Sequence, residues 1–366
     1  VGWWSNLNYG GTLTYFALNK AVQALGYSVM MIQPPRSDGS LPAMDTVPMR
    51  FAKKHYVISH VYSHRDMHLL NYACKGFISG SDQLWNPWLE QYAGKECFLS
   101  FANSNSLRLS YASSYGNVSS FPNEFIEKYK PELKKFDAVL FPCTKNGVDI
   151  FAGRAKETVI ISNAVMVSEM LSPEECEQEQ KDGKTICCTG SLTYQRGITH
   201  LIKAAHKAGV KLILAGKYSS DAYQKELEQM PEYSCVEYLG YLGRQELAKV
   251  YARSSIGMST ILNVGQYSSL DNFPTKVYEY MAAGLPVIVS DYPFMRKSVQ
   301  QDGFGVAVDP ADVDAIAKTI QDVLSDQQAA LKMGENGRAA VLNKYNWGIE
   351  EEKLFALYKK LQKGLS

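Results

Sequence analysis

The feature that most constrains the fold is the alternation of short apolar segments with amphipathic helices along the second half of the chain. The apolar segments have the length and composition of buried strands. They occupy residues 185–191, 210–217, 234–242, 256–261, 285–291 and 303–310. Strands that alternate with helices predict a parallel sheet covered by helices on both faces. The predicted fold class is therefore α/β.

The first half of the chain begins with the same pattern. Residues 1–4 are predicted to form a short buried strand, 12–26 a helix that ends at its final glycine, and 27–33 a second strand. Residues 50–76 have a largely helical pattern. Strands that run into polar turns follow at 76–87, 107–116 and 136–144.

The polar stretch 171–184 separates the two series and is typical of a linker. We therefore predict two doubly wound, Rossmann-like domains. The first is residues 1–168, completed by an amphipathic C-terminal helix over 347–366, and the second is residues 169–346. Ligands of such sheets bind at the carboxyl ends of the strands, so a cleft between the two domains is the expected site.

Composition excludes several classes of function. Lys and Arg number 38 and Asp and Glu 37, so no global basic charge favours nucleic acid as a partner. The 7 cysteines include no CxxC pair, which predicts reduced, structural thiols and a cytoplasmic location. No apolar run reaches the roughly 18 residues of a membrane span. The first residues lack the basic start and apolar core of a signal peptide.

The stretch DNFPTKVYEYMAAGLPVIVSD, residues 271–291, combines the signals of an anion site. Pro274 fits the first turn of a helix, whose free N–H groups and partial positive charge suit a diphosphate. Lys276 adds a full charge there, which is unfavourable for the helix dipole and therefore favours an anionic ligand. Glu279 lies about one turn later, where it would accept hydrogen bonds from ribose hydroxyls. An ordinary solvated helix is the alternative.

This stretch resembles the donor-site motif of family 4 glycosyltransferases, which have the GT-B fold. The family has two glutamates separated by seven residues. Asp271 takes the first position and Glu279 the second. The resemblance implies that Glu279 holds the ribose and that Asp271 contacts the donor sugar. Asn272 and Phe273 replace part of the glycine-containing segment that lies against the donor in the family.

The likeness extends from about residue 185 to the C-terminus. CCTGSLTYQRG resembles the family's strand and loop that place two cations on the diphosphate. Here Gly190 is followed by Ser191 where the family has arginine, and Arg196 precedes the next glycine. The nucleobase would rest on backbone near Leu242. The resemblance also implies retention of anomeric configuration and no catalytic metal or other cofactor.

The first half of the chain resembles the polysaccharide pyruvyl transferases, over about residues 1–120 and most specifically in GSDQLWNP. Gly10 and Gly11 open the first helix, where backbone can approach an anionic donor closely. Asn8 and Tyr9 flank them at the end of a strand. A bare tight turn is the alternative.

A second group of candidates lies in GSDQLWNP, after another strand end. Asp82 and Gln83 are predicted to meet acceptor hydroxyls. Trp85 and Trp88 either stack on sugar rings or pack within the domain. Inversion with Asp82 as the base remains an alternative to retention.

Two further patterns have a functional and an ordinary interpretation. His60, His64 and His68 fall at helical spacing and form either a metal-binding face or a solvated one. The basic segment 50–55, interleaved with aromatic side chains, lies either against an anionic membrane or in water.

Taken together, the sequence predicts a nucleotide-sugar-dependent glycosyltransferase with a saccharide or lipid-linked saccharide acceptor. It would build a bacterial-type surface polysaccharide such as capsule or O-antigen on the cytosolic side of a membrane. The alternatives are a pyruvyl transferase that uses phosphoenolpyruvate and a non-catalytic protein that binds nucleotide-sugars.

Overall fold

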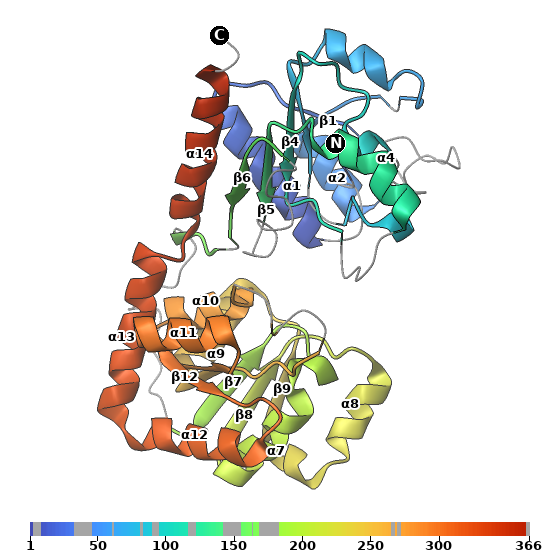
Figure 1. The fold of residues 1–366 in the computed structure, drawn as a ribbon. Coiled ribbons are helices and arrows are strands. Elements are labelled where there is room, and N and C mark those ends of the chain that lie inside the picture. The colour runs from blue at the N-terminus through green and yellow to red at the C-terminus, as the bar shows by residue number, and fades with distance from the viewer. Residues whose placement is uncertain are drawn as a thin grey trace. The chain divides into compact units, whose positions relative to one another are not determined.

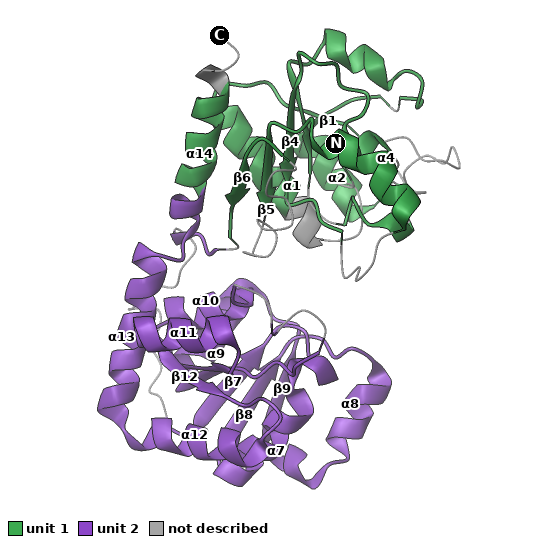
Figure 2. Cartoon of the chain, in the orientation of Figure 1, with its two compact units in different colours: residues 1–162, 351–366 green, residues 163–350 purple. Residues whose placement is uncertain are grey.

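The computed structural model shows two compact units, and each has its own parallel sheet (Figure 1). Unit 1 comprises residues 1–162 and 351–366, and unit 2 comprises residues 163–350 (Figure 2). The sequence predicts that the first domain ends at residue 168 and resumes at residue 347, whereas unit 1 ends at residue 162 and resumes at residue 351. The structure describes residues 1–2, 9–32, 46–60, 62–80, 83–89, 95–115, 122–141, 155–162, 164–167, 183–264, 268 and 272–363.

Unit 1 has a four-stranded parallel sheet in the order β3-β4-β5-β6 and a parallel pair, β1 and β2. Its strands are β1 (Met30–Met31), β2 (Val57–Ile58), β3 (Gly76–Ser79), β4 (Leu107–Tyr111), β5 (Ala138–Phe141) and β6 (Thr158–Ile160). Its helices are α1 (Tyr9–Ala24), α2 (Val47–His55), α4 (Asn123–Leu133), and the short 3-10 helices η1 (Met67–Tyr72), η2 (Pro87–Leu89) and η3 (Lys95–Phe98).

The first two residues connect the two groups of strands in unit 1. The amide of Gly80 donates to the carbonyl of Val1 at 2.8 Å. The amide of Gly2 donates to the carbonyl of Ile32 at 3.4 Å. These residues therefore lie as an extended segment between the end of β3 and the end of β1. The predicted strand over 1–4 is described only for these two residues.

The predicted helix over 50–76 is wrong beyond its first turns. Helix α2 ends at His55, and the chain then extends as β2, which pairs with β1 in parallel register. The β-branched Val57 and Ile58 favour an extended backbone, and the ring of Tyr56 is buried just before them. Pairing with a strand distant in sequence therefore outweighs the helical periodicity of this segment.

Unit 2 has a six-stranded parallel sheet in the order β12-β11-β10-β7-β8-β9. Its strands are β7 (Thr185–Thr189), β8 (Lys211–Ala215), β9 (Val236–Gly240), β10 (Ile256–Ser259), β11 (Val287–Ser290) and β12 (Gly305–Val308). Its helices are α7 (Ile198–Ala208), α8 (Asp221–Glu228), α9 (Arg244–Arg253), α10 (Thr275–Ala282), α11 (Pro293–Asp302), α12 (Val313–Ser325), α13 (Gln327–Asn343) and the 3-10 helices η5 (Tyr194–Arg196) and η6 (Pro231–Cys235).

Each face of this sheet has its own apolar core. Ile186 and Cys188 of β7 belong to the core that contains α7 and α12, whereas Cys187, between them, belongs to the core that contains α9 and α10. Figure 1 shows these helices on opposite sides of the sheet. Successive side chains of a strand point to opposite faces, so a strand buried on both faces has to be apolar throughout. The predicted α/β, doubly wound class is confirmed.

The sheet order places a topological switch point between β7 and β10. The chain leaves β7 toward β8 on one side and continues from β10 toward β11 on the other. Loops that leave neighbouring strands in opposite directions open a crevice at the carboxyl ends of these strands. The residues that follow β7 and β10 are therefore the first place to look for a ligand site.

The C-terminal helix α14 (Trp347–Lys363) runs across the boundary between the units at Glu350 and Glu351. Leu354, Leu357 and Tyr358 are buried along one side of it. The predicted amphipathic helix at this place in the sequence is confirmed.

Two glycines at the ends of α7 provide a matched test of the packing at the switch point. Gly197 and Gly209 have φ values of 74° and 72°, but only at Gly197 would a Cβ meet a neighbour, the carbonyl oxygen of Thr260 at 2.0 Å. Gly209→Ala should lower the free energy of unfolding by about 1 kcal/mol. Gly197→Ala should lower it by about 3 kcal/mol or more. Urea unfolding measures both, and equal losses would contradict the tight contact with Thr260.

Candidate functional site

The loop after β7 lies close against the end of the neighbouring strand β8. The amide of Gly190 donates to the carbonyl of Ala215 at 2.8 Å. A Cβ at Gly216 would lie 1.7 Å from the carbonyl oxygen of Gly190. Gly190 itself has a φ of 102° and nothing within 4 Å of a Cβ position. Glycine is therefore required on both strands where their backbones turn past one another.

Arg196 is held beside this loop by a short capped turn. It ends η5, and its amide donates to the hydroxyl of Thr193 at 3.1 Å. The next residue, Gly197, lies against the carbonyl of Thr260 just after β10. Ser191, which precedes this turn, is exposed. The structure thus fixes the backbone of Arg196 at the carboxyl ends of β7 and β10.

Lys276 is one of the few charged residues of unit 2 that the structure describes as buried. It lies in the first turn of α10 and has a relative exposure of 8%. Its Nζ lies 3.4 Å from the Sγ of Cys188 in β7. Within the part of the chain that the structure describes, no carboxylate pairs with it. A buried amino group without a counter-ion at a helix N-terminus is costly for the protein alone and favourable toward an anion.

Glu279 lies one turn after Lys276 and is exposed. The hydroxyl of Tyr251, in α9, donates to its Oε2 at 2.7 Å. Burial raises the pKa of Tyr251, and the negative charge of Glu279 raises it further. Tyr251 therefore stays a neutral O–H donor to the carboxylate. Lys276 and Glu279 thus present a cation and an anion on one short helix.

The side chains of Asn272 and Phe273 are turned into the core of unit 2, and donor binding by this segment stays a prediction. Both are buried, and Asn272 Oδ1 accepts from the amide of Phe273 at 2.9 Å and from the hydroxyl of Tyr278. The ring of Phe273 packs against those of Phe294 and Phe304. These side chains hold the segment before α10 in place. Leu242, which follows β9, is half-buried against the same core.

Several predicted residues lie outside the described part of the chain, namely Asn8, Asp82 and Asp271. Tyr9, Gly10 and Gly11 form the first turn of α1, which begins earlier than the sequence predicted. The glycines therefore lie inside the helix and not in a loop before it. Glycine is tolerated there because the first N–H groups of a helix have no partner within it.

The predicted acceptor role of Trp85 is wrong, and the packing interpretation applies. Trp85 has a relative exposure of 0%, and its Nε1 donates to the carbonyl of Cys97 at 3.0 Å. Its ring stacks on Phe98 in the core of unit 1. Gln83 and Trp88 are exposed.

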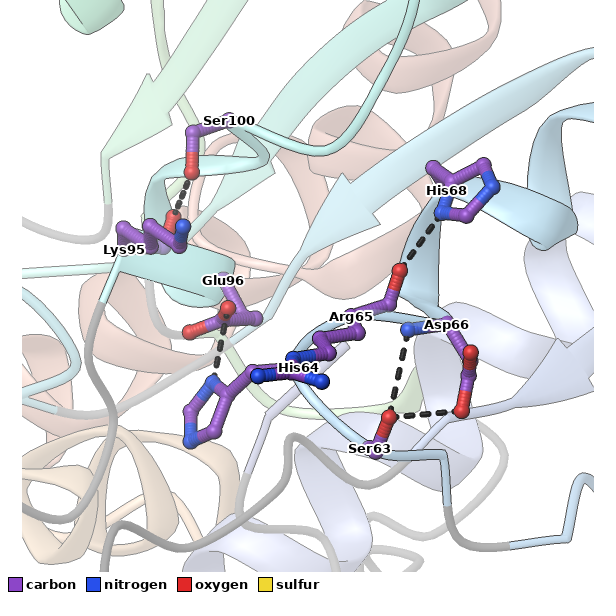
Figure 3. A network of polar contacts seen from close by, with 8 residues as sticks. All are labelled: Ser63, His64, Arg65, Asp66, His68, Lys95, Glu96 and Ser100. Carbon is purple, nitrogen blue, oxygen red and sulfur yellow. Dashed lines mark hydrogen bonds and ion pairs between the residues drawn. The ribbon is translucent and has the colours of Figure 1, made fainter.

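The three histidines do not form a helical metal face. His64 Nδ1 lies 2.9 Å from Oε1 of Glu96, a carboxylate with a relative exposure of 1% (Figure 3). His68 Nδ1 lies 2.6 Å from the carbonyl of Arg65, and the ring of His60 lies tilted against that of Tyr62. Among the described residues, no group of three His, Cys, Asp or Glu side chains could hold a metal ion.

Two further predictions concern surfaces and thiols. Arg50, Lys53 and Lys54 are exposed on α2, and a helix that could cross a membrane is not found among the described residues. The cysteines that the structure describes are free thiols: Cys74, Cys97, Cys187, Cys188 and Cys235.

Sequence reasoning missed the thiol beside Lys276 and the hydrogen-bonded hydroxyls that lead to Glu279. Tyr251 and Tyr280 look like ordinary core residues of amphipathic helices, and Thr189 ends an apolar strand. Their hydroxyls meet only because α9 and α10 pack on the same face of the sheet. The adjacent Cys187 and Cys188 gave a correct prediction of a buried strand, but not of the contact with Lys276.

Comparisons with known proteins point to glycosyltransferases. Residues 173–340 match the family model described as glycosyl transferases group 1. An uncharacterized glycosyltransferase of Methanocaldococcus jannaschii is 30% identical over 185 residues, which are 49% of this chain and 46% of that protein. Phosphatidyl-myo-inositol mannosyltransferase of Mycobacterium tuberculosis is 26% identical over 218 residues, 55% of this chain and 54% of that protein. The matched region spans about half the length of these curated relatives.

Solved structures resemble nearly the whole chain. Sucrose-phosphate synthase from Thermosynechococcus elongatus covers 98% of this chain and 94% of its own, with a TM-score of 0.66 and 20% identity. HepE of Anabaena, solved in complex with UDP, covers 97% of both chains, with a TM-score of 0.71 and 13% identity. These GT-B neighbours confirm the predicted fold class. The resemblance of the C-terminal half to glycosyltransferases is also confirmed, whereas that of the N-terminal half to pyruvyl transferases stays a prediction.

If Lys276 is retained for a ligand and not for stability, an apolar side chain should serve the fold better. Lys276→Met should raise the free energy of unfolding by about 1 kcal/mol, because a buried charge is replaced by a side chain of similar length. Lys318→Met is the control, since Lys318 is exposed and pairs with Asp322 at 2.8 Å, and should change it by less than about 0.5 kcal/mol. Urea unfolding of both variants measures these changes. A clearly lower free energy of unfolding for Lys276→Met would contradict the view that Lys276 is retained for a ligand.

Proposed function

We propose that this protein is a glycosyltransferase that transfers a sugar from a nucleotide-sugar donor to a saccharide or lipid-linked saccharide acceptor. The donor diphosphate binds at the N-terminus of α10 and at the loop after β7. The acceptor is handled by unit 1. The reaction belongs to the synthesis of a surface polysaccharide on the cytosolic side of a membrane.

The observation that carries the proposal is the buried Lys276 beside the exposed Glu279. A nucleoside diphosphate needs a cation for its phosphates and an acceptor for its ribose hydroxyls, and these two side chains lie one turn apart on α10. The helix N-terminus adds free N–H groups for the phosphate oxygens. A sulfur atom is the only described hydrogen-bonding partner of Lys276, so a diphosphate would supply the counter-ion that the described residues do not.

The chemistry follows from charge that develops on the leaving group. As the bond between the sugar and the diphosphate breaks, negative charge grows on the diphosphate, where Lys276, Arg196 and the end of α10 stabilise it. The acceptor hydroxyl attacks from the same side of the sugar and passes its proton to the departing diphosphate oxygen, so the anomeric configuration is retained. Asp271 contacts the donor sugar in this scheme. The side-chain cations provide the positive charge, so the reaction proceeds without a bound metal.

The names of similar proteins support this class of donor. Structures of HepE are titled as complexes with UDP and with UDP-glucose. A relative from Mycobacterium tuberculosis is named a GDP-mannose-dependent mannosyltransferase, and it is 24% identical over 180 residues. These names agree on a nucleoside diphosphate and differ in base and sugar, so a panel of nucleotides is the appropriate test.

The test is a thermal-shift screen with UDP-, GDP-, ADP- and CMP-sugars, their free nucleotides and phosphoenolpyruvate, with EDTA present throughout. One family of nucleoside diphosphates should raise the melting temperature, because a ligand that binds only the folded state stabilises it. Glu279→Ala should weaken that nucleotide at least about tenfold, since the ribose loses a charged acceptor.

Glu335→Ala is the matched control, because Glu335 is an exposed glutamate of the same unit whose partner is Lys332 at 3.1 Å. It should leave nucleotide affinity unchanged. A shift with phosphoenolpyruvate alone would favour a pyruvyl transferase. Nucleotide binding without sugar transfer or donor hydrolysis would favour a non-catalytic binding protein. Unchanged affinity in Glu279→Ala would contradict the donor site.

We further propose that α2 contacts an anionic membrane that carries the acceptor. Arg50, Lys53 and Lys54 are exposed on this helix, and its N-terminal Val47 is exposed as well. Each lysine near an anionic surface contributes about 1 kcal/mol. The names of several relatives contain phosphatidylinositol, an anionic phospholipid.

Replacing both Lys53 and Lys54 by glutamine should weaken binding to phosphatidylglycerol vesicles by about thirtyfold at low salt. The control removes the same charge from the exposed Lys207 and Lys318 of unit 2 and should have little effect. Co-sedimentation with the vesicles measures both, and equal binding of the two double variants would remove the membrane proposal.

A further inference from the structure

We infer that Tyr251 is the positioning residue of Glu279, and that a chain of hydroxyls from the end of β7 orients this carboxylate toward the ribose of the donor. This inference rests on the proposed function and extends it, because it names a group that the donor never touches. The three hydroxyls belong to Thr189, Tyr251 and Tyr280, which come from β7, α9 and α10.

The contacts form a continuous path from backbone to carboxylate. The amide of Thr189 donates to the hydroxyl oxygen of Tyr280 at 2.9 Å, and the two hydroxyls lie 3.1 Å apart. The hydroxyl of Thr189 lies 3.3 Å from that of Tyr251, which donates to Glu279 Oε2 at 2.7 Å. All of these groups except Glu279 are buried.

The carboxylate determines the direction of every donor in the path. A carboxylate only accepts, so the proton of Tyr251 points to Glu279. The oxygen of Tyr251 must then accept from Thr189, and Thr189 must accept from Tyr280. The oxygen of Tyr280 is free to accept from the amide of Thr189, which can only donate. Each hydroxyl therefore donates once and accepts once, an arrangement in which hydrogen bonds strengthen one another.

The surroundings keep both tyrosines protonated and in place. Burial raises the pKa of Tyr280 well above its ordinary value, as it does for Tyr251. The ring of Tyr280 fits against Gly257 of β10, where a Cβ would lie 2.3 Å from the ring. The rings of Tyr251 and Tyr280 meet edge to face at 5.5 Å. The donor to Glu279 is thus fixed by packing on a sheet strand and two helices.

The consequence for Glu279 is a preorganised carboxylate on an exposed side chain. A free glutamate side chain loses rotamer entropy when a ligand orders it. Tyr251 orders it beforehand and holds Oε2, which leaves Oε1 for a ligand hydroxyl. A side chain ordered before binding loses less entropy when the ligand arrives.

The experiment separates positioning from simple loss of structure by comparing two ligands. Tyr251→Phe should bind the preferred nucleoside diphosphate about tenfold more weakly than the wild type, while its affinity for inorganic pyrophosphate, which has no ribose, stays within twofold. A distorted site would weaken both ligands. Tyr292→Phe is the matched control, because the hydroxyl of Tyr292 also donates inside unit 2, to the carbonyl of Ile261 at 2.7 Å. It should change neither affinity.

A double-variant cycle tests whether the effect passes through Glu279. In a Glu279→Ala background, Tyr251→Phe should cause no further loss of nucleotide affinity. An additional tenfold loss there would overturn the inference. If Tyr251→Phe unfolds, Thr189→Val interrupts the same path and should produce a smaller loss confined to the ribose-containing ligand.

The outcomes also separate this inference from the proposed function. If the wild type binds a nucleoside diphosphate and Tyr251→Phe binds it equally tightly, the positioning role is wrong and the donor site stands. If the wild type binds no nucleoside diphosphate, the proposed function is wrong, and the role of Tyr251 falls with it.

Discussion

The candidate site depends on the position of β7 at the centre of a parallel sheet. This strand is buried on both faces and has β8 on one side and β10 on the other. Chain reversal on its two sides leaves its carboxyl end uncovered by either connection. The loop with Gly190, the turn with Arg196 and the start of α10 all gather around that end. The charges of the site are therefore brought together by the strand order.

One charged side chain of the site is placed where it destabilises the empty protein and favours an anionic ligand. Lys276 lies at the end of a helix dipole that repels it, in a region that withdraws it from water. Glu279 is exposed, and it accepts a stabilising hydrogen bond from the hydroxyl of Tyr251. The placement of Lys276 alone does not favour the empty protein. It becomes favourable when a ligand brings negative phosphates, which is how sites with locally poor stability become functional.

The sequence predicted the strands and most helices of unit 2 because burial on both faces makes a strand apolar throughout, as in TICCT. It predicted Lys276 and Glu279 because α10 places them one turn apart whatever surrounds the helix. It failed over residues 50–76, where pairing of β2 with the distant β1 decides the structure. It also missed Tyr251 and Thr189, because hydroxyls from separate elements meet only after the helices pack. Trp85 was misjudged because aromatic side chains serve cores and sugar sites equally well.

The path of α14 has a consequence for how the protein can be divided. This helix begins in unit 2 and ends in unit 1, where Lys360 pairs with Glu157 at 2.8 Å. The burial of Tyr358 raises its pKa, and it lies near Tyr27 and Tyr111 of the first unit. A fragment that stops at residue 162 would therefore lack part of its own core. The autonomous folding unit is made of two segments that are distant in sequence, so no single proteolytic cut can release unit 1 whole.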